Sequence, residues 1–176
     1  MQLRLSRPRT IIFGLVGIVA LTVALGAVSL APSRAQVAPP PILIEPLTPR
    51  SVFTDDVSGQ FRVKFEGHGN EVVNMQDPSR TLVARITVQP GARFPWHTHS
   101  GPVIVNIAQG ELVYVAATDC VERPYAAGTA FVDPGHGHVH TAFNRTSGVT
   151  VFYATFFEVP EAGPLTITEG IQEPSC

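Results

Sequence analysis

The feature that most restricts the fold of this chain is a series of short apolar segments between about residues 52 and 160. In these segments apolar and polar residues alternate, or β-branched and aromatic residues predominate, and glycine, proline, asparagine or aspartate ends them. The segments are 61–67, 81–91, 102–118 (two strands meeting near Gln109 and Gly110), 128–135, 138–144 and 149–159. Because no stretch has the spacing of a long amphipathic helix, the sequence predicts an all-β sandwich or barrel of about 8–11 strands.

The first 35 residues have a different pattern. Three arginines precede an apolar run at 11–30, and the small-residue site Ser33–Ala35 follows it. This order is typical of a secretory signal peptide cleaved after Ala35 (domain 1–35). A run of about 20 residues is also long enough for an uncleaved membrane anchor. We therefore expect an exported protein, periplasmic or secreted, that contacts a membrane only if this segment is retained.

Prolines divide the remainder of the chain. Residues 36–51 contain five prolines, a composition that predicts an extended linker. Residues 52–160 make up the predicted barrel domain. Residues 161–176, with two further prolines, are expected to form an irregular C-terminal tail.

Charge excludes one class of partner. The leader holds four of the 12 basic residues and no acidic residue, so the remainder has 8 basic against 14 acidic residues, a net charge of −6. No basic cluster is left, which argues against binding to nucleic acid or to an anionic membrane surface.

Two cysteines are present, Cys120 and Cys176. In an exported protein an even pair indicates a disulfide, which would fix the tail to the loop around Cys120. Two free thiols, or an exposed Cys176 that links two chains, are the alternatives.

Five of the six histidines fall in two short windows, "WHTH" with His97 and His99, and "PGHGHVH" with His136, His138 and His140. Residues two apart in a strand point to the same face. Two such strands side by side would bring three or four imidazoles to one ion. The pattern therefore predicts a site for one divalent transition metal (Fe, Mn, Zn, Ni or Cu).

At these residues the sequence resembles the cupin superfamily. The first cupin motif, G-x5-H-x-H-x(3 or 4)-E-x6-G, is matched by Gly91, His97, His99 and Gly110, with Val103 in place of the glutamate. The resemblance implies a Greek-key β-barrel, a double-stranded β-helix, with the metal inside. His97 and His99 are ligands by this resemblance.

The second cupin motif, G-x5-P-x-G-x2-H-x3-N, is matched by Gly128, Pro134, Gly137, His140 and Asn144, with one extra residue after the proline. The two motifs follow each other at the spacing of a compact cupin, and the resemblance covers about 80–159. It makes His140 the third ligand. Asn144 is expected to act outside the ligand set by hydrogen bonding to a ligand histidine or to a turn.

The absence of the motif carboxylate at Val103 changes the expected chemistry. Three neutral imidazoles leave a divalent ion with its full charge, which favours a small anionic or bidentate ligand. Three-histidine cupins that this arrangement resembles include dioxygenases that bind substrate directly to Fe(II). His138 is the candidate for a fourth protein ligand, whereas His136 is expected to be an exposed loop residue.

Three residues near the motifs have simpler interpretations. Phe94 and Trp96 could line a substrate entrance, but strand alternation favours packing on the face opposite His97. Asp133, directly before Pro134, is expected to form a turn rather than to act as an acid.

The sequence thus predicts an exported cupin that binds a divalent metal and a small anionic molecule, either as a dioxygenase or related metalloenzyme, or as a non-catalytic barrel for storage, sensing or binding. No general acid or base can be named. A homodimer through the outer strands is compatible with the resemblance.

Overall fold

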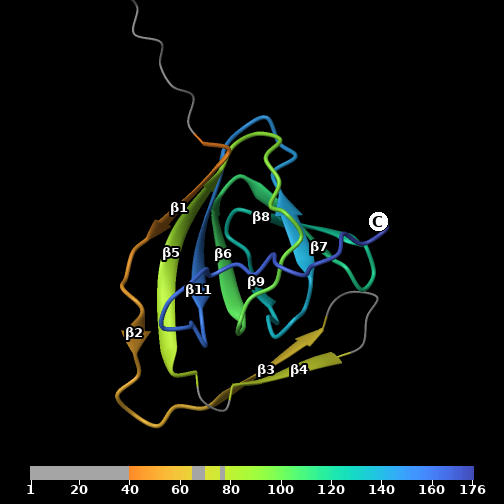
Figure 1. The fold of residues 1–176 in the computed structure, drawn as a ribbon. Coiled ribbons are helices and arrows are strands. Elements are labelled where there is room, and N and C mark those ends of the chain that lie inside the picture. Colours follow the sequence, from red (N-terminus) through yellow and green to blue (C-terminus); the bar gives the residue numbers. More distant parts are fainter. Residues whose placement is uncertain (1–39, 65–69, 76–77) are drawn as a thin grey trace, which may run out of the picture. The chain divides into compact units, whose positions relative to one another are not determined.

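The computed structural model describes residues 40–64, 70–75 and 78–176. In these ranges the regular secondary structure consists of strands alone, and every strand pair is antiparallel (Figure 1). The strands are β1 (Ile42–Pro46), β2 (Ser51–Val52), β3 (Gly59–Lys64), β4 (Asn70–Met75), β5 (Arg80–Val88), β6 (Val103–Gln109), β7 (Glu111–Ala116), β8 (Glu122–Ala126), β9 (Ala130–Asp133), β10 (His140–Phe143) and β11 (Thr150–Phe156). The predicted all-β class is confirmed.

Two sheets position the site. The larger has the order β1-β5-β11-β6-β9, with β2 also paired to β5, and the smaller has the order β10-β7-β8. Alternate residues of β5, β6 and β11 point inward, as their burial patterns show. They form one core with inward residues of β7, β9 and β10. The predicted break at Gly110 is confirmed, since it separates β6 from β7 with a φ of 74°.

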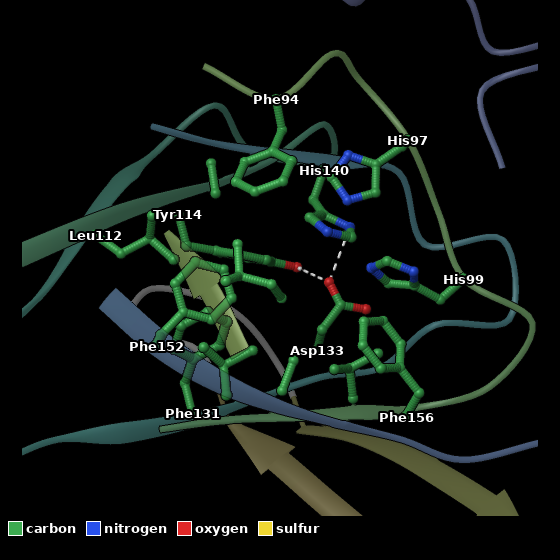
Figure 2. Close-up of a pocket in the computed structure, with 15 residues that line it drawn as sticks. Phe94, His97, His99, Leu112, Tyr114, Phe131, Asp133, His140, Phe152 and Phe156 are labelled. Atoms are coloured by element: carbon green, nitrogen blue, oxygen red, sulfur yellow. Dashed lines mark hydrogen bonds and ion pairs between the residues drawn. The ribbon is translucent and has the colours of Figure 1, made fainter. Parts of the chain in front are cut away.

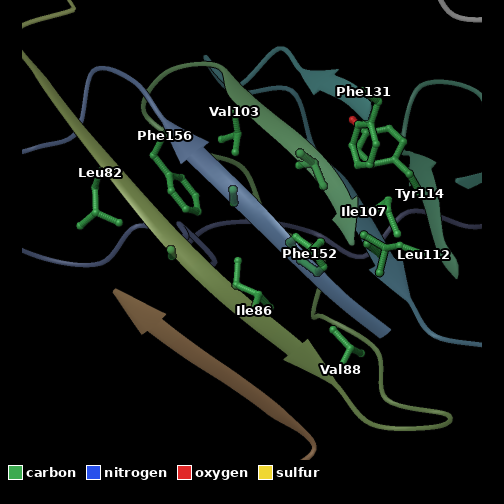
Figure 3. Packing of buried hydrophobic residues seen from close by; sticks show 14 of the residues in the cluster. Leu82, Ile86, Val88, Val103, Ile107, Leu112, Tyr114, Phe131, Phe152 and Phe156 are labelled. Carbon is green, nitrogen blue, oxygen red and sulfur yellow. The ribbon is translucent and has the colours of Figure 1, made fainter. Parts of the chain in front are cut away.

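Figure 3 shows the inward side chains of the large sheet packed in a row, with Phe152 and Phe156 of β11 between those of β5 and β6. Burying a side chain of this size stabilises the fold by about 1.5–3 kcal/mol. The opposite wall includes Leu112 and Tyr114, each 1 % exposed. The interior is therefore apolar except where the two histidine windows enter it.

The hairpin β3–β4 lies across one end of the sheets (Figure 1), and Val63 on β3 packs against the core. Only part of the predicted 61–67 strand can be compared, because residues 65–69 lie outside the described ranges. The predicted signal segment lies outside them as well.

In the described part of the predicted linker, residues 40–51, the chain forms β1 and β2. All five residues of β1 pair with β5, and Ile42 packs on the core. A proline-rich sequence can do this because β1 is the edge of its sheet and Pro46 is its last residue, where a missing N–H costs little.

The C-terminal segment 161–176 contains no strand, but it is fixed to the domain at several points. Cys120 and Cys176 form the predicted disulfide, with a Cα–Cα distance of 5.5 Å. Ile167 and Thr98 exchange two backbone hydrogen bonds of 2.9 and 3.0 Å. In the described part of the chain we find no helix suited to crossing a membrane.

Candidate metal centre

The two histidine windows meet backbone to backbone. His97 and His140 are opposite each other in an antiparallel bridge, and each accepts an N–H bond of 2.9 Å from the other. Residues 91–97 thus extend the sheet beside β10, with Phe94 N–H bonding to Ala142 O at 2.9 Å. The predicted pairing of the two windows is present.

Three imidazoles gather on this pairing. One ring nitrogen each of His97, His99 and His140 lies within 4.8 Å of the other two. Their ring centroids are 4.1–5.2 Å apart, and the residues are only 4–8 % exposed. Figure 2 shows the three rings together at one side of the cavity. This cluster is the arrangement that the motif resemblance implies for a metal.

Hydrogen bonds determine which ring nitrogen of His97 and of His99 is available to bind a metal. His97 Nδ1 lies 2.7 Å from Pro95 O, and His99 Nδ1 lies 2.8 Å from Leu165 O. A carbonyl oxygen can only accept, so each Nδ1 carries the hydrogen and each Nε2 keeps its lone pair. Leu165 belongs to the tail, so one candidate ligand is oriented by the segment that the disulfide fixes.

The third ring is held differently, by a carboxylate. His140 Nδ1 lies 2.8 Å from Asp133 Oδ2, which also accepts a 3.1 Å hydrogen bond from Tyr114 Oη. The amide of Gly135 donates to Asp133 Oδ1 at 2.7 Å. The turn expected at Asp133 is therefore present, but the sequence interpretation missed the contact with His140, which depends on residues brought together only by folding.

The pKa of Asp133 is lowered although the residue is 2 % exposed. Burial alone would raise it, but the charge of His140, the hydrogen bond with His140, the charge of His99 and the Gly135 amide together outweigh burial. Asp133 is therefore ionised, and its carboxylate accepts a hydrogen bond at the histidine cluster.

Burial favours the neutral form of two of the histidines, His97 and His99. It lowers the pKa of His97 to about 3, with a further contribution from the neighbouring His140 and His99. Burial likewise lowers the pKa of His99. Because a metal binds the neutral imidazole, burial keeps His97 in the binding form well below neutral pH and favours the same form of His99.

The cluster borders a small cavity of about 50 Å³. Its lining is mostly apolar and aromatic and contains no lysine or arginine among the described residues; it comprises Ile86, Phe94, His97, His99, Val103, Val105, Leu112, Tyr114, Phe131, Asp133, His140, Ala142, Phe152, Ala154 and Phe156. Sites for drug-sized ligands measure about 300–1,000 Å³. The space therefore suits only a few non-hydrogen atoms.

Phe94 corrects the expectation that it packs opposite His97. Its ring centroid lies 5.8 Å from that of His97, and it lines the cavity. The segment around Pro95 forms isolated bridges rather than a regular strand, so strict alternation does not apply. Trp96 lies in a separate surface groove with Cys120 and Cys176.

His138 does not join the cluster. Its Nε2 faces Glu71 Oε2 at 3.4 Å instead. The preceding turn explains this, because Gly135, His136 and Gly137 all have positive φ and β10 begins only at His140. His136 is exposed, as expected, and pairs with Glu158.

Asn144 bonds to a turn and not to a ligand histidine. Its Nδ2 donates to Val88 O at 3.1 Å and to Gly148 O at 2.7 Å, while its Oδ1 accepts from the backbone N–H and the hydroxyl of Thr146. These four bonds use the full capacity of a side-chain amide.

Comparison with known proteins gives matches in structure only, since no family model and no curated protein matches the sequence. Similar solved structures include a conserved protein of unknown function from Streptococcus pyogenes (16% identity, TM-score 0.44, covering 69% of this chain and 76% of that chain). Another is the polyketide cyclase RemF from Streptomyces resistomycificus (15% identity, TM-score 0.44, covering 53% of this chain and 63% of that chain). A third is a cupin-like protein from Thermotoga maritima (25% identity, TM-score 0.41, covering 45% of this chain and 58% of that chain). Many of these structural neighbours are cupin-superfamily proteins.

Proposed function

We propose that this chain is an exported cupin that binds one divalent transition metal through His97, His99 and His140 and presents it to a small anionic molecule. The observation that carries the proposal is the clustering of three buried imidazoles, each with Nδ1 held by an acceptor. Their Nε2 atoms are left as candidate ligand atoms, and imidazole suits zinc, copper, iron and nickel. A core histidine cluster without a ligand would be costly to bury.

With three protein ligands, a bound ion would keep open positions at which small ligands could exchange. Catalytic zinc sites have three protein ligands and an open position, whereas structural sites are closed by a fourth. His138, the candidate fourth ligand, faces Glu71. The remaining positions would face the apolar cavity.

The cavity limits the ligand in size and charge. About 50 Å³ accommodates a small carboxylate or diketone, but not a three-ring flavonol without rearrangement of its walls. No cationic side chain lines the cavity in the described chain, so an anion would depend on the ion itself for charge compensation.

The enzymatic form of the proposal is a small-molecule dioxygenase. Bound Fe(II) would supply Lewis-acid and O2 chemistry. The chain contributes the three histidines that hold the ion and the walls that exclude water, among them Phe94, Phe152 and Phe156.

A non-catalytic metal or ligand carrier is the second candidate. It is favoured by the engagement of the two other polar groups at the cavity, since Tyr114 donates to Asp133 and both Asp133 oxygens accept hydrogen bonds. Both groups are therefore held in place by contacts within the protein.

Export is supported by two independent features. The first 35 residues have the order of a signal peptide, and the disulfide between Cys120 and Cys176 is typical of an oxidising compartment.

The test begins with elemental analysis of the protein isolated from the compartment to which a bacterial host exports it. We expect about one metal ion per chain, lost in His97→Gln, His99→Gln and His140→Gln but kept in the matched controls His136→Gln and His138→Gln. Oxygen consumption by the Fe(II)-loaded protein is then measured with small carboxylates and diketones. Turnover supports the dioxygenase, metal without turnover supports the carrier, and metal-free protein that fails to bind any of the five ions overturns the proposal.

A further inference from the structure

The third candidate ligand differs from the other two in what orients it. His97 and His99 are held by backbone carbonyls, but His140 Nδ1 lies 2.8 Å from a carboxylate oxygen of Asp133. The carbonyl of His138 is a poorer acceptor for the same nitrogen, at 3.3 Å. Asp133 is therefore the principal acceptor for this ring.

The carboxylate is itself fixed from two sides. The Gly135 amide holds Oδ1 at 2.7 Å and the Tyr114 hydroxyl holds Oδ2 at 3.1 Å. The Tyr114 ring also stacks on the His140 ring, with centroids 5.0 Å apart and planes at 23°. The three side chains come from β7, β9 and β10, and Figure 2 shows the chain of contacts from Tyr114 through Asp133 to His140.

Solvent does not compete for these contacts. Tyr114, Asp133 and His140 are 1 %, 2 % and 4 % exposed. Buried carboxylates that accept from a metal-binding histidine fix its tautomer and its ring orientation. A core role alone would not require the carboxylate to face this particular nitrogen.

We propose that Asp133 is a positioning residue that holds His140 as its Nδ1–H tautomer, leaving Nε2 for the metal. This inference rests on the proposed metal site. Tyr114 supports it by completing the hydrogen bonding of the carboxylate and by limiting rotation of the ring.

The variant Asp133→Asn tests the tautomer directly. The Gly135 amide can only donate, so it selects the oxygen of the new side chain. The NH2 group then faces His140 Nδ1, which must accept, and the hydrogen moves to Nε2. An isosteric change is thus expected to present the wrong face of the imidazole to the metal.

The experiment combines nitrogen NMR of 15N-histidine-labelled, metal-free protein with zinc affinity measured by chelator competition. The wild-type His140 resonance, assigned by its loss in His140→Gln, should report Nδ1–H, and Asp133→Asn should report Nε2–H. Zinc affinity should fall about 10–100-fold in this variant. Glu158→Gln, which alters the exposed pair with His136, is the matched control and should change affinity less than threefold.

Each outcome decides one claim. An Nε2–H tautomer in the wild-type protein overturns the inference even if Asp133→Asn fails to fold. Unchanged tautomer and zinc affinity in a folded Asp133→Asn also overturn it, while the metal site remains. Absence of zinc binding in the wild-type protein instead rejects the proposed metal site, and the tautomer of the metal-free wild-type protein still decides the positioning role.

Discussion

Asp133 on β9 and Val103 on β6 are register partners in an antiparallel pair, and both are 2 % exposed and line the same cavity. Side chains directly opposite in such a pair lie on the same face. The carboxylate missing from the motif position thus has a counterpart one strand away, directed to His140. A divalent ion at the three histidines would therefore have this negative charge nearby.

Restoring the motif carboxylate is expected to destabilise the metal-free protein. Val103→Glu places a second buried carboxylate beside Asp133, and an unpaired buried charge costs about 3–5 kcal/mol. Metal binding should recover much of this loss. The free energy of urea unfolding, measured with and without zinc, checks the prediction against Val103→Gln, which has the same length and no charge. Equal stability of the two metal-free variants would contradict it.

Acid is expected to weaken the metal-free fold before the carboxylates titrate. The pKa of His97 is about 3 in the fold against 6.5 in the unfolded chain, so the unfolded state binds the proton first. Stability is therefore lost as the pH falls from about 6.5 toward 3, by about 2 kcal/mol between pH 6.5 and 4.5. His99 shifts in the same direction.

This pH dependence can be followed by urea unfolding with the fluorescence of the single tryptophan, Trp96, as the signal. His97→Gln removes one of the two titrating groups and should reduce the stability lost between pH 6.5 and 4.5 by about 2 kcal/mol, leaving the contribution of His99. A wild-type profile that is already flat over this range would refute the prediction.

Loss of the disulfide is expected to affect both stability and metal affinity. The bond spans 56 residues, for which loop closure predicts a loss of about 4 kcal/mol on removal, with 2–4 kcal/mol typical. The double variant Cys120→Ser, Cys176→Ser also frees the tail whose Leu165 carbonyl orients His99. We expect zinc affinity to fall several-fold in the folded fraction.

Urea unfolding and zinc competition measure the two effects separately. The wild-type protein under reducing conditions should reproduce the double variant. An unchanged zinc affinity with lowered stability would show that the tail does not orient His99.

Removing the Asn144 side chain should lower stability without a direct effect on the metal site. Asn144→Ala removes the four hydrogen bonds made by a fully buried side chain, with an expected cost of about 2–4 kcal/mol. Asn106→Ala, at an exposed position, is the control. A large fall in zinc affinity of the folded variant would indicate that Asn144 acts on a ligand histidine after all.

Much of the fold could be predicted because it depends on local pattern. The alternation of apolar and polar residues along β5 predicted its inward face, and Gly110 predicted the break between β6 and β7. β1 was missed because the five prolines of residues 36–51 dominate the composition around it, whereas its place depends on the free edge of β5. An edge is a property of the assembled sheet and leaves no signal in the strand that covers it.

The candidate site, like the fold, has a part that could be predicted from the sequence and a part that could not. The resemblance to the cupin motifs implied the cluster of His97, His99 and His140, whereas two-residue spacing by itself allowed three or four imidazoles and left His138 open. His138 shares the sequence parity of His140 but follows a turn of positive-φ residues, where parity no longer predicts direction.

By itself, the sequence determined the strand class and the cysteine pair, because alternation and residue count are local or nearly local properties, and its resemblance to the cupin motifs implied the histidine triad. Only the tertiary structure decided that Asp133 contacts His140, that Leu165 orients His99 and that Phe94 lines the cavity. The reason is physical: each of these depends on side chains or backbone groups from separate segments, whose positions are set by packing across the two sheets.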